Sequence, residues 1–371
     1  MSMKEEYLQK GYVFHGYFPP ELTSEEEYPD YIKIPTQIKA DKINSIRNES
    51  TFTFAFMADT HFTPTHNHHI RLMRALSAYR DVADRVGVDR LIVAGDLGAN
   101  GTREFALNSL KEFGKHLEGI NFYPAVGNHD DNTIWQACIE SPKSEHHLTN
   151  DEIYDTLFSH LPALNVRTGK EGRKTYYYFD DAICKVRYIV LDITDIPYVM
   201  EDGNLKYKSQ HIYAYSQNQL DWLTKDALSF AEDGWSIVFI THNAATGNAA
   251  EDSYLGVLND ILGAYKNANS IKADFYDDEF RVSVDCDFSH LKRADIVGVF
   301  YGHYHSDIIT KDKNGIVYIA TSNATMYNHG DHIRKDGTFG EILFDVVTVD
   351  KSNRKIYLTR IGYGEDREVS Y

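Results

Sequence analysis

The stretch TFTFAFMADTH, residues 51–61, decides how this chain folds. Its phenylalanines alternate with smaller residues from Thr51 to Ala58, and this period of two predicts a β-strand. The strand ends directly before two polar residues, Asp59 and His61. The same design, an apolar strand followed at once by polar side chains, recurs along the chain.

Two further stretches repeat this design. Residues 90–96 read RLIVAGD and residues 122–130 read FYPAVGNHD, and in both the apolar run stops at a glycine followed by a polar residue. Apolar residues three and four positions apart predict helices between the strands, over 67–86 and 102–117. This β-α-β-α-β order predicts parallel strands joined by crossover helices, and therefore an α/β fold.

The rest of the chain continues to alternate. We expect strands at 175–179, 187–191, 235–240 and 296–300, helices at 151–159, 216–230 and 254–267, and a tail of hairpin-like strands at 317–320, 342–349 and 356–361. Weak periodicity predicts an extended N-terminal arm, residues 1–50, packed on a main domain, residues 51–371. Polar, irregular sequence predicts insertions into that domain at about 131–172 and 243–290.

Charge restricts the partners of the protein. The 371 residues carry a formal net charge of -17, which argues against general binding to nucleic acid, because that binding depends on Lys and Arg. An enzyme this acidic that acted on phosphate esters would need a local cation, which bound metal can supply.

With no apolar signal core and no run of transmembrane length, we expect a soluble, cytoplasmic protein.

Seven residues with metal-binding side chains follow the predicted strands: Asp59, His61, Asp96, Asn128, His242, His303 and His305. In an open α/β sheet, ligands bind beyond the carboxyl ends of the strands, so these side chains could converge. Imidazole and carboxylate suit zinc, iron and manganese, whereas the lack of thiolate argues against a structural zinc cluster. Seven ligands exceed the needs of one tetrahedral ion and suit two ions that share a carboxylate.

The motifs differ in specificity. Asp59-Thr60-His61 and Gly95-Asp96 are each common by chance, whereas GNHD at 127–130 and GHYH at 302–305 are rare. For the remaining ligand we choose His242, because it follows a strand; the alternatives are His211 and His290.

Taken together, these motifs resemble those of the calcineurin-like metallophosphoesterases over roughly residues 52–350. The resemblance implies a four-layer α/β/β/α sandwich. It implies that one ion is held by Asp59, His61 and His305, that a second is held by Asn128, His242 and His303, and that Asp96 bridges them. It also implies that His129 contacts the phosphate and protonates the leaving group, with Asp130 supporting or flanking it.

The chain departs from the family pattern in two places. Many members continue the second motif to an arginine that grips phosphate, whereas here Asp96 is followed by Leu97-Gly98-Ala99-Asn100. This difference counts against the protein Ser/Thr phosphatase branch and favours a phosphodiesterase. Asn100 either reaches the site or forms a turn. The family often has His-x-Pro at His242, but Asn243-Ala244 follows here.

We therefore expect a binuclear metal-dependent hydrolase of phosphoesters, small or polymeric, that prefers diesters and uses in-line attack by a metal-bridging hydroxide. The ligand types do not distinguish manganese, iron and zinc. The alternatives are a phosphomonoesterase and a non-catalytic binding module on the same fold. The oligomeric state is not predicted.

Some histidines and the tail have no assigned role. His66, His68 and His69 could line a substrate groove, but they are more typical of a solvated helix start, and His146 and His147 are treated in the same way. His329 and His332 lie in a glycine-rich loop that could approach the site. The tail GYGEDR, residues 362–367, resembles a C-terminal segment of some bacterial relatives, and its alternative interpretation is a glycine-rich turn.

Overall fold

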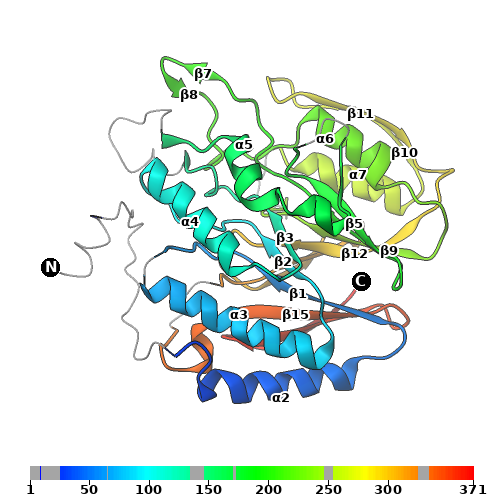
Figure 1. Ribbon diagram of the computed structural model, residues 1–371. Helices are drawn as coiled ribbons and strands as arrows, with labels where there is room; N and C mark the ends of the chain where they lie inside the picture. The colour runs from blue at the N-terminus through cyan, green and yellow to red at the C-terminus, as the bar shows by residue number, and fades with distance from the viewer. Residues whose placement is uncertain are drawn as a thin grey trace.

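The computed structural model describes residues 26–64, 66–133, 146–169, 173–245, 254–324 and 334–371, together with Gln9. Two large sheets dominate this part of the chain (Figure 1). Among the described residues, no helix combines the length and apolar composition that a membrane span requires.

The first sheet has the strand order β17-β16-β15-β1-β2-β3. Its strands are β1 (Thr51–Met57), β2 (Leu91–Ala94), β3 (Phe122–Ala125), β15 (Leu343–Asp350), β16 (Lys355–Gly362) and β17 (Arg367–Ser370). As predicted, β1, β2 and β3 are parallel, but β15 pairs with β1 in antiparallel register and makes the sheet mixed.

The second sheet has the strand order β13-β14-β12-β9-β6-β5-β4. Its strands are β4 (Arg167–Thr168), β5 (Tyr177–Asp181), β6 (Val186–Val190), β9 (Trp235–Ile240), β12 (Ala294–Tyr301), β13 (Ile308–Lys311) and β14 (Val317–Ala320). The central strands β6, β9, β12 and β14 run parallel. The predicted tail strands therefore separate, because β14 lies in this sheet and the β15–β16 hairpin lies in the first.

The two sheets pack face to face. The ring of Phe54 on β1 lies 5.4 Å from the ring of Tyr188 on β6 and 5.4 Å from that of Phe300 on β12. Side chains alternate along β9, so that Val238 faces this shared core and Phe239 faces the opposite side. The phenylalanines that predicted the first strand thus form the contact between the sheets.

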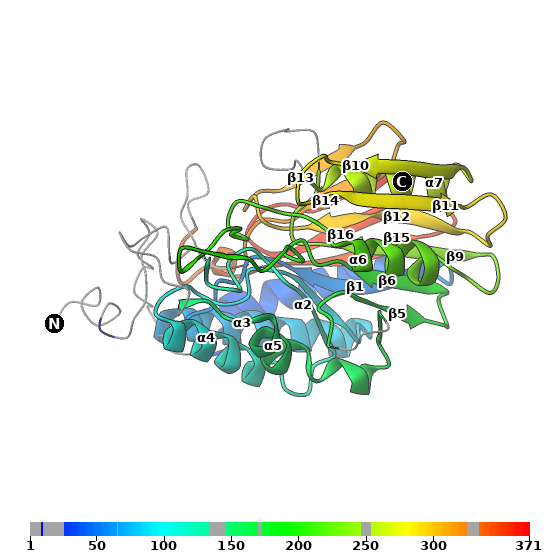
Figure 2. The same ribbon diagram turned by 90° about the horizontal axis from the view of Figure 1, so that it is seen from above.

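Helices cover the outer faces (Figures 1 and 2). On the first sheet they are α2 (Asp30–Ile46), α3 (His66–Val86) and α4 (Arg103–His116), and on the second they are α6 (Gln217–Trp222), extended by the π-helical turn η5 (Leu223–Ala227), and α7 (Gly256–Lys266). The order helix, sheet, sheet, helix confirms the four-layer α/β/β/α prediction.

The described part of the N-terminal arm differs from the prediction. Residues 30–46 form helix α2 rather than an extended segment, and α2 packs on α3, β15 and β16. Its buried positions are Ile32, Thr36, Ala40 and Ile43. This stripe carries only two large apolar residues and Pro35 lies inside the helix, which weakens the helical signal in the sequence.

One of the two predicted insertions, residues 243–290, contains a helix that belongs to the central fold. Helix α7, within 243–290, joins parallel β9 and β12 and packs on the second sheet, as a crossover helix does. The hairpin β10 (Ser270–Phe275) and β11 (Val282–Asp287) follows it. Within 131–172 the chain forms α5 (Asn150–Ile153), the π-helical turn η3 (Tyr154–Phe158) and the 3-10 turn η4 (Leu161–Leu164), of which η3 packs on α4. Residues 134–145 and 170–172 lie outside the described chain.

Candidate metal centre

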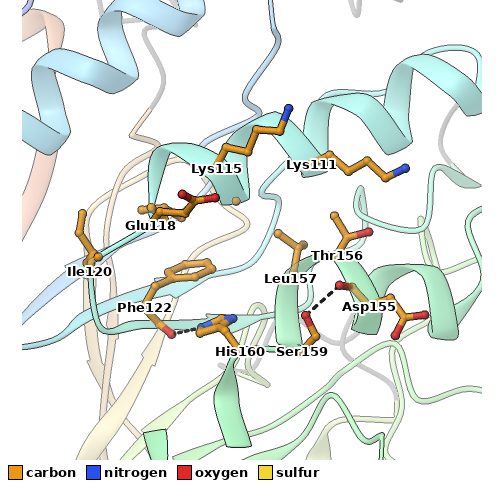
Figure 3. A pocket seen from close by; sticks show the side chains of 13 residues that line it. Lys111, Lys115, Glu118, Ile120, Phe122, Asp155, Thr156, Leu157, Ser159 and His160 are labelled. Carbon is orange, nitrogen blue, oxygen red and sulfur yellow. Dashed lines mark hydrogen bonds between the residues drawn. The ribbon is translucent and has the colours of Figure 1, made fainter. Parts of the chain in front are cut away.

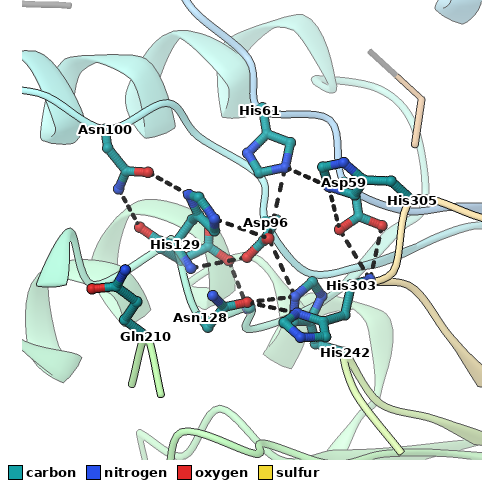
Figure 4. A network of polar contacts seen from close by, with 12 residues as sticks. Asp59, His61, Asp96, Asn100, Asn128, His129, Gln210, His242, His303 and His305 are labelled. Carbon is teal, nitrogen blue, oxygen red and sulfur yellow. Dashed lines mark hydrogen bonds and ion pairs between the residues drawn. The ribbon is translucent and has the colours of Figure 1, made fainter. Parts of the chain in front are cut away.

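The seven predicted ligands come together where the strands of both sheets end (Figure 4). Asp59, His61, Asp96 and Asn128 follow β1, β2 and β3 of the first sheet, and His242, His303 and His305 follow β9 and β12 of the second. Hydrogen bonds join the two sets, from His303 N to Asp59 Oδ1 (3.0 Å) and from Ala324 N to Ala58 O (2.9 Å). The site therefore lies across the junction of the two sheets.

The donor atoms form two groups that share one carboxylate. The first group is Asp59, His61, Asp96 and His305, and the second is Asp96, His242 and His303; within each, one donor atom per residue lies within 4.8 Å of all the others. Asn128 Oδ1 joins the second group, 2.9 Å from His242 Nε2 and 3.1 Å from His303 Nδ1. Nitrogen and oxygen donors at this spacing can hold two transition-metal ions.

The surroundings of His242 fit a cation. Its Nδ1 lies 2.7 Å from the Ala94 carbonyl, to which it donates, so that Nε2 points into the site. There Nε2 meets Asn128 Oδ1 and, at 3.2 Å, Asp96 Oδ2, both of which are acceptors. Without a metal this contact requires a proton, and although burial opposes it, Asp96 raises the pKa of His242 to about 9. A metal ion could take the place of that proton.

The surroundings shift the pKa values of the other three histidine ligands in different directions. Burial and the neighbouring His129 lower the pKa of His61 well below its usual value, and burial with His242 lowers that of His303 to about 3. Although burial opposes it, the Asp59 carboxylate raises the pKa of His305. His61 follows β1 and His305 follows β12, and their Nε2 atoms lie 3.1 Å apart. The two rings therefore point toward the same place.

The backbone of the site is strained. Five of the seven residues have φ in the left-handed region: Asp59 (53°), His61 (39°), Asp96 (53°), His303 (68°) and His305 (51°). Such conformations cost roughly 1–3 kcal/mol each and persist only where the surroundings enforce them. Here, His61 N donates to Asp96 O (2.8 Å), and His303 N donates to both oxygens of Asp59 (3.0 Å each).

Glycines precede three of the ligands, and they let neighbouring loops of the site lie close together. A Cβ on Gly127 would lie 2.1 Å from Asp96 N, and a Cβ on Gly302 would lie 2.4 Å from Asp59 Oδ2. Only Gly95, at φ 80°, also needs the left-handed conformation. Close packing therefore requires glycine at all three positions, and backbone conformation requires it at one.

His129 lies beside the two groups. Its backbone N donates to Asp96 Oδ1 (2.9 Å), and its Nε2 is 3.8 Å from Asp96 Oδ2. Its Nδ1 contacts Asn100 Oδ1, while Asn100 Nδ2 donates to the His129 carbonyl (2.8 Å). Of the two roles considered for Asn100, the structure therefore shows that it reaches the site, where it orients His129.

Asp130 points away from the donor atoms and into the turns. Its carboxylate accepts from Leu97 N (2.7 Å), Gly98 N (3.3 Å) and Gly127 N (2.8 Å). Burial and the nearby Asp96 raise the pKa of Asp130 to about 7. Asp130 thus holds the loop after β2 against the loop after β3, which is a supporting position.

Comparison with known proteins places this site in a family. The family model for calcineurin-like phosphoesterases matches residues 52–307. The chain belongs to the calcineurin-like phosphoesterase family. No curated protein sequence matches the chain. Family membership supports a metal-dependent phosphoester hydrolase.

One similar solved structure is a dimetal phosphatase from Danio rerio, with a TM-score of 0.53 and 12% sequence identity. The alignment covers 86% of this chain and 99% of that protein. At this identity the likeness shows the fold alone. Neither comparison distinguishes diesters from monoesters as substrates.

The structure also places the remaining histidines. Of the three candidates for one ligand position, His242 lies in the site, whereas His211 and His290 are exposed and outside both donor groups. The rings of His69 and His116 meet edge to face, with centroids 4.4 Å apart, and His147 is buried beside Asp131 in a cavity. The side chains of His66 and His68, and all of His329 and His332, lie outside the described residues.

Several residues that support the site gave no signal in the sequence. Asn132 Oδ1 accepts from Asn100 Nδ2 (3.2 Å), Ser209 Oγ donates to Asn128 O (3.1 Å), and Ser322 Oγ donates to His305 O (3.0 Å). Their partners are distant in sequence, and single Ser and Asn residues carry no motif. Gln210, beside Ser209, is also seen near His129 (Figure 4).

A cavity of about 580 Å³ lies elsewhere, between α4 and η3 (Figure 3). It is lined by Lys111, Lys115 and His160, with Phe122, the first residue of β3, at its base. Asn128 follows the carboxyl end of the same strand. The cavity is therefore at the opposite end of β3 from the metal centre.

Proposed function

We propose that this family member hydrolyses phosphodiesters with two metal ions bound at the site described above. The observation that carries the proposal is the pair of donor groups that share Asp96, with His129 beside them. Asp59, His61, Asp96 and His305 would hold one ion, and Asp96, Asn128, His242 and His303 the other. Manganese, iron and zinc all suit these donors.

Bound metal would supply Lewis acidity at the phosphoryl oxygens and a water of lowered pKa. The protein would supply the rigid frame. Asp96 is 1% exposed and Asp59 0%, so both carboxylates are held away from bulk water, where their charge acts strongly on a bound ion. Asn128 would add a neutral oxygen without further negative charge.

His129 would act as the general acid. Asn100 accepts from Nδ1, which orients the ring and leaves Nε2 near Asp96 to face a departing ester oxygen. In its doubly protonated form, His129 keeps the bond to Asn100 and can give its Nε2 proton to the leaving group. Such proton transfer typically contributes ~10²–10⁴-fold to the rate.

The loop after Asp96 supports a preference for diesters. Residues 97–102 contain no cationic side chain, and Arg103, the next one, donates to the His147 carbonyl (3.0 Å) and pairs with Glu152. Arginine pairs with phosphate through charge-assisted hydrogen bonds, and this attraction is stronger for a more highly charged phosphate. A diester carries one negative charge and needs that partner less than a monoester dianion does.

The test compares bis-(p-nitrophenyl) phosphate with p-nitrophenyl phosphate on the Mn²⁺-loaded enzyme. We expect the higher kcat/KM for the diester, and the Asp96→Asn variant as control should be inactive on both. A clear preference for the monoester would instead establish the second candidate, a phosphomonoesterase.

A non-catalytic binding module is the remaining alternative. Metal analysis after reconstitution distinguishes it, because we expect about two equivalents of transition metal per chain if both donor groups are occupied. Less than one equivalent, with no activity on either ester, would identify a binding module.

A further inference from the structure

The loop that carries His303 and His305 is anchored by the C-terminal tail. Asp307 lies two residues after His305 and directly before β13. Its Oδ1 accepts from Arg360 Nη2 (2.6 Å), from Ser322 N (3.0 Å) and from Arg367 Nη1 (2.9 Å). Arg367 is the last residue of the tail segment GYGEDR, whose role the sequence left open.

A second carboxylate completes the cluster. Asp345 on β15 accepts from Arg360 Nε (2.8 Å), from Thr321 Oγ1 (2.7 Å) and from Arg367 Nη2. The cluster Asp307, Asp345, Arg360 and Arg367 thus has two positive and two negative charges. Asp345 and Arg360 have fully buried side chains, and those of Arg367 and Asp307 are 13% and 29% exposed.

The tail geometry brings the arginines into place. At Gly362, φ is 103° and a Cβ would lie 1.9 Å from Ile342 O, so this turn requires glycine. At Gly364, φ is 97° and a Cβ would lie 2.9 Å from Arg360 Nη1. Arg360 Nη1 also donates to the Tyr363 carbonyl (2.7 Å). The glycines therefore let the tail wrap around the Arg360 guanidinium.

The cluster connects the two sheets beside the metal centre. Asp345, Arg360 and Arg367 belong to β15, β16 and β17 of the first sheet, and Asp307 belongs to the loop between β12 and β13 of the second. The metal ligands are divided between the same two sheets. Because His303 and His305 have strained backbones, their loop keeps its shape only while its anchors hold it.

We propose that Arg360 and Arg367, acting through Asp307, are positioning residues for the metal centre. They hold the loop 302–307 so that His303 and His305 face the ligands of the first sheet. The tail GYGEDR is then part of the metal-binding apparatus rather than a simple turn. This inference rests on the proposed function, since it requires that the seven residues bind metal.

The test is Asp307→Asn, which keeps an oxygen for Ser322 N but removes the charge that pairs with the arginines. The matched control is Asp181→Asn, because Asp181 also joins the sheets through an arginine, Arg90 (2.9 Å), and also accepts backbone N–H groups. That pair is 13% exposed on both sides and lies at the amino-terminal end of β2, away from the metal ligands.

Calorimetric titration of the metal-free proteins with Mn²⁺ gives the readout, with urea unfolding measured in parallel. We expect Asp307→Asn to bind Mn²⁺ ~10–100-fold more weakly, the usual effect of losing an outer-shell partner. Asp181→Asn should stay within about twofold of wild type even where its loss of unfolding stability is similar. Unchanged Mn²⁺ affinity in Asp307→Asn would overturn the inference.

A second variant keeps the test decisive if Asp307→Asn does not fold. Arg367→Lys retains the charge but loses the guanidinium fork that reaches both carboxylates, so its Mn²⁺ affinity should also fall. Wild-type affinity in Arg367→Lys would overturn the inference while leaving the proposed function intact. A wild-type protein that binds none of Mn²⁺, Fe²⁺ and Zn²⁺ would overturn both.

Discussion

At the scale of single residues, Asp96 organises the centre. Its Oδ2 lies 3.2 Å from His242 Nε2 and 3.7 Å from His61 Nε2, and its Oδ1 accepts from His129 N. Although burial favours the neutral carboxyl, His242 and His129 hold the pKa of Asp96 well below its usual range. Asp96 therefore presents a full negative charge to both donor groups.

The role of His129 can be tested with leaving groups of different basicity. For His129→Ala, we expect kcat to fall ~10²–10⁴-fold on diesters with an alkoxide leaving group, because that group needs a proton. The loss should be much smaller with p-nitrophenolate, which departs unprotonated. Steady-state kinetics on the two substrate types checks this, and equal losses on both would exclude the general-acid role.

The glycine before Asn128 gives a second prediction. In Gly127→Ala, the new Cβ would lie 2.1 Å from Asp96 N and 2.2 Å from Asp96 Oδ1, so Asp96 must move. We expect the purified variant to contain less than half the wild-type metal, measured by mass spectrometry. Gly256→Ala is the control, because it meets no atom within 4 Å and should retain full metal content.

At the scale of elements, a carboxylate also follows β6, where it belongs to neither donor group found among the described residues. Asp192 follows β6, and its carboxylate accepts from Thr194 N (2.7 Å), Thr194 Oγ1 (2.7 Å) and the Thr175 hydroxyl. Burial and the neighbouring Asp195 raise the pKa of Asp192 to about 6. This strand end therefore binds a proton more tightly when folded than when unfolded.

A pH-dependent stability follows from Asp192. The raised pKa means that its contribution is complete below about pH 4 and is lost as the pH rises to about 6, by roughly 2–3 kcal/mol. Asp192→Asn keeps an acceptor for Thr194 and cannot ionise, so its advantage over wild type should grow across that window. Urea unfolding at several pH values measures the difference, and a constant difference would contradict the assignment.

At the scale of the whole molecule, the centre joins two sheets. Four of the seven side chains follow strands of the first sheet and three follow strands of the second. Below them, the aromatic contacts of Phe54 with Tyr188 and Phe300 hold the sheets together. Bound metal would therefore add cross-links between two halves that otherwise depend largely on apolar packing.

Removal of metal should lower the stability of the entire fold. At metal concentrations about 1,000-fold above Kd, a single bound ion contributes ~4 kcal/mol to the free energy of unfolding. We expect Tm to fall on treatment with EDTA and to recover with Mn²⁺, as measured by calorimetry. Asp96→Asn, which weakens both donor groups, should show little response to Mn²⁺, and a wild-type Tm independent of metal would refute this prediction.

Local sequence accounted for most strands and for the longer helices. The period of two at Thr51–Ala58 and the apolar runs near Leu91 and Phe122 predicted β1, β2 and β3, since each strand is buried and its pattern is local. Helix α2 and the edge strands β13 and β17 were not predicted, because short or weakly apolar segments take their structure from what they pack against.

The sequence by itself determined the α/β order of the chain and six of the seven candidate ligands, because each of the six follows a strand within a short motif. His242 has no such motif, and the sequence left His211 and His290 as alternatives to it. Tertiary structure alone decided the rest. It brought two sheets together so that Asp96 could serve both donor groups, and it placed Asn100 on His129 and Arg360 on Asp307. Those contacts join residues 29 and 53 positions apart, and only packing of the folded layers brings them within hydrogen-bonding distance.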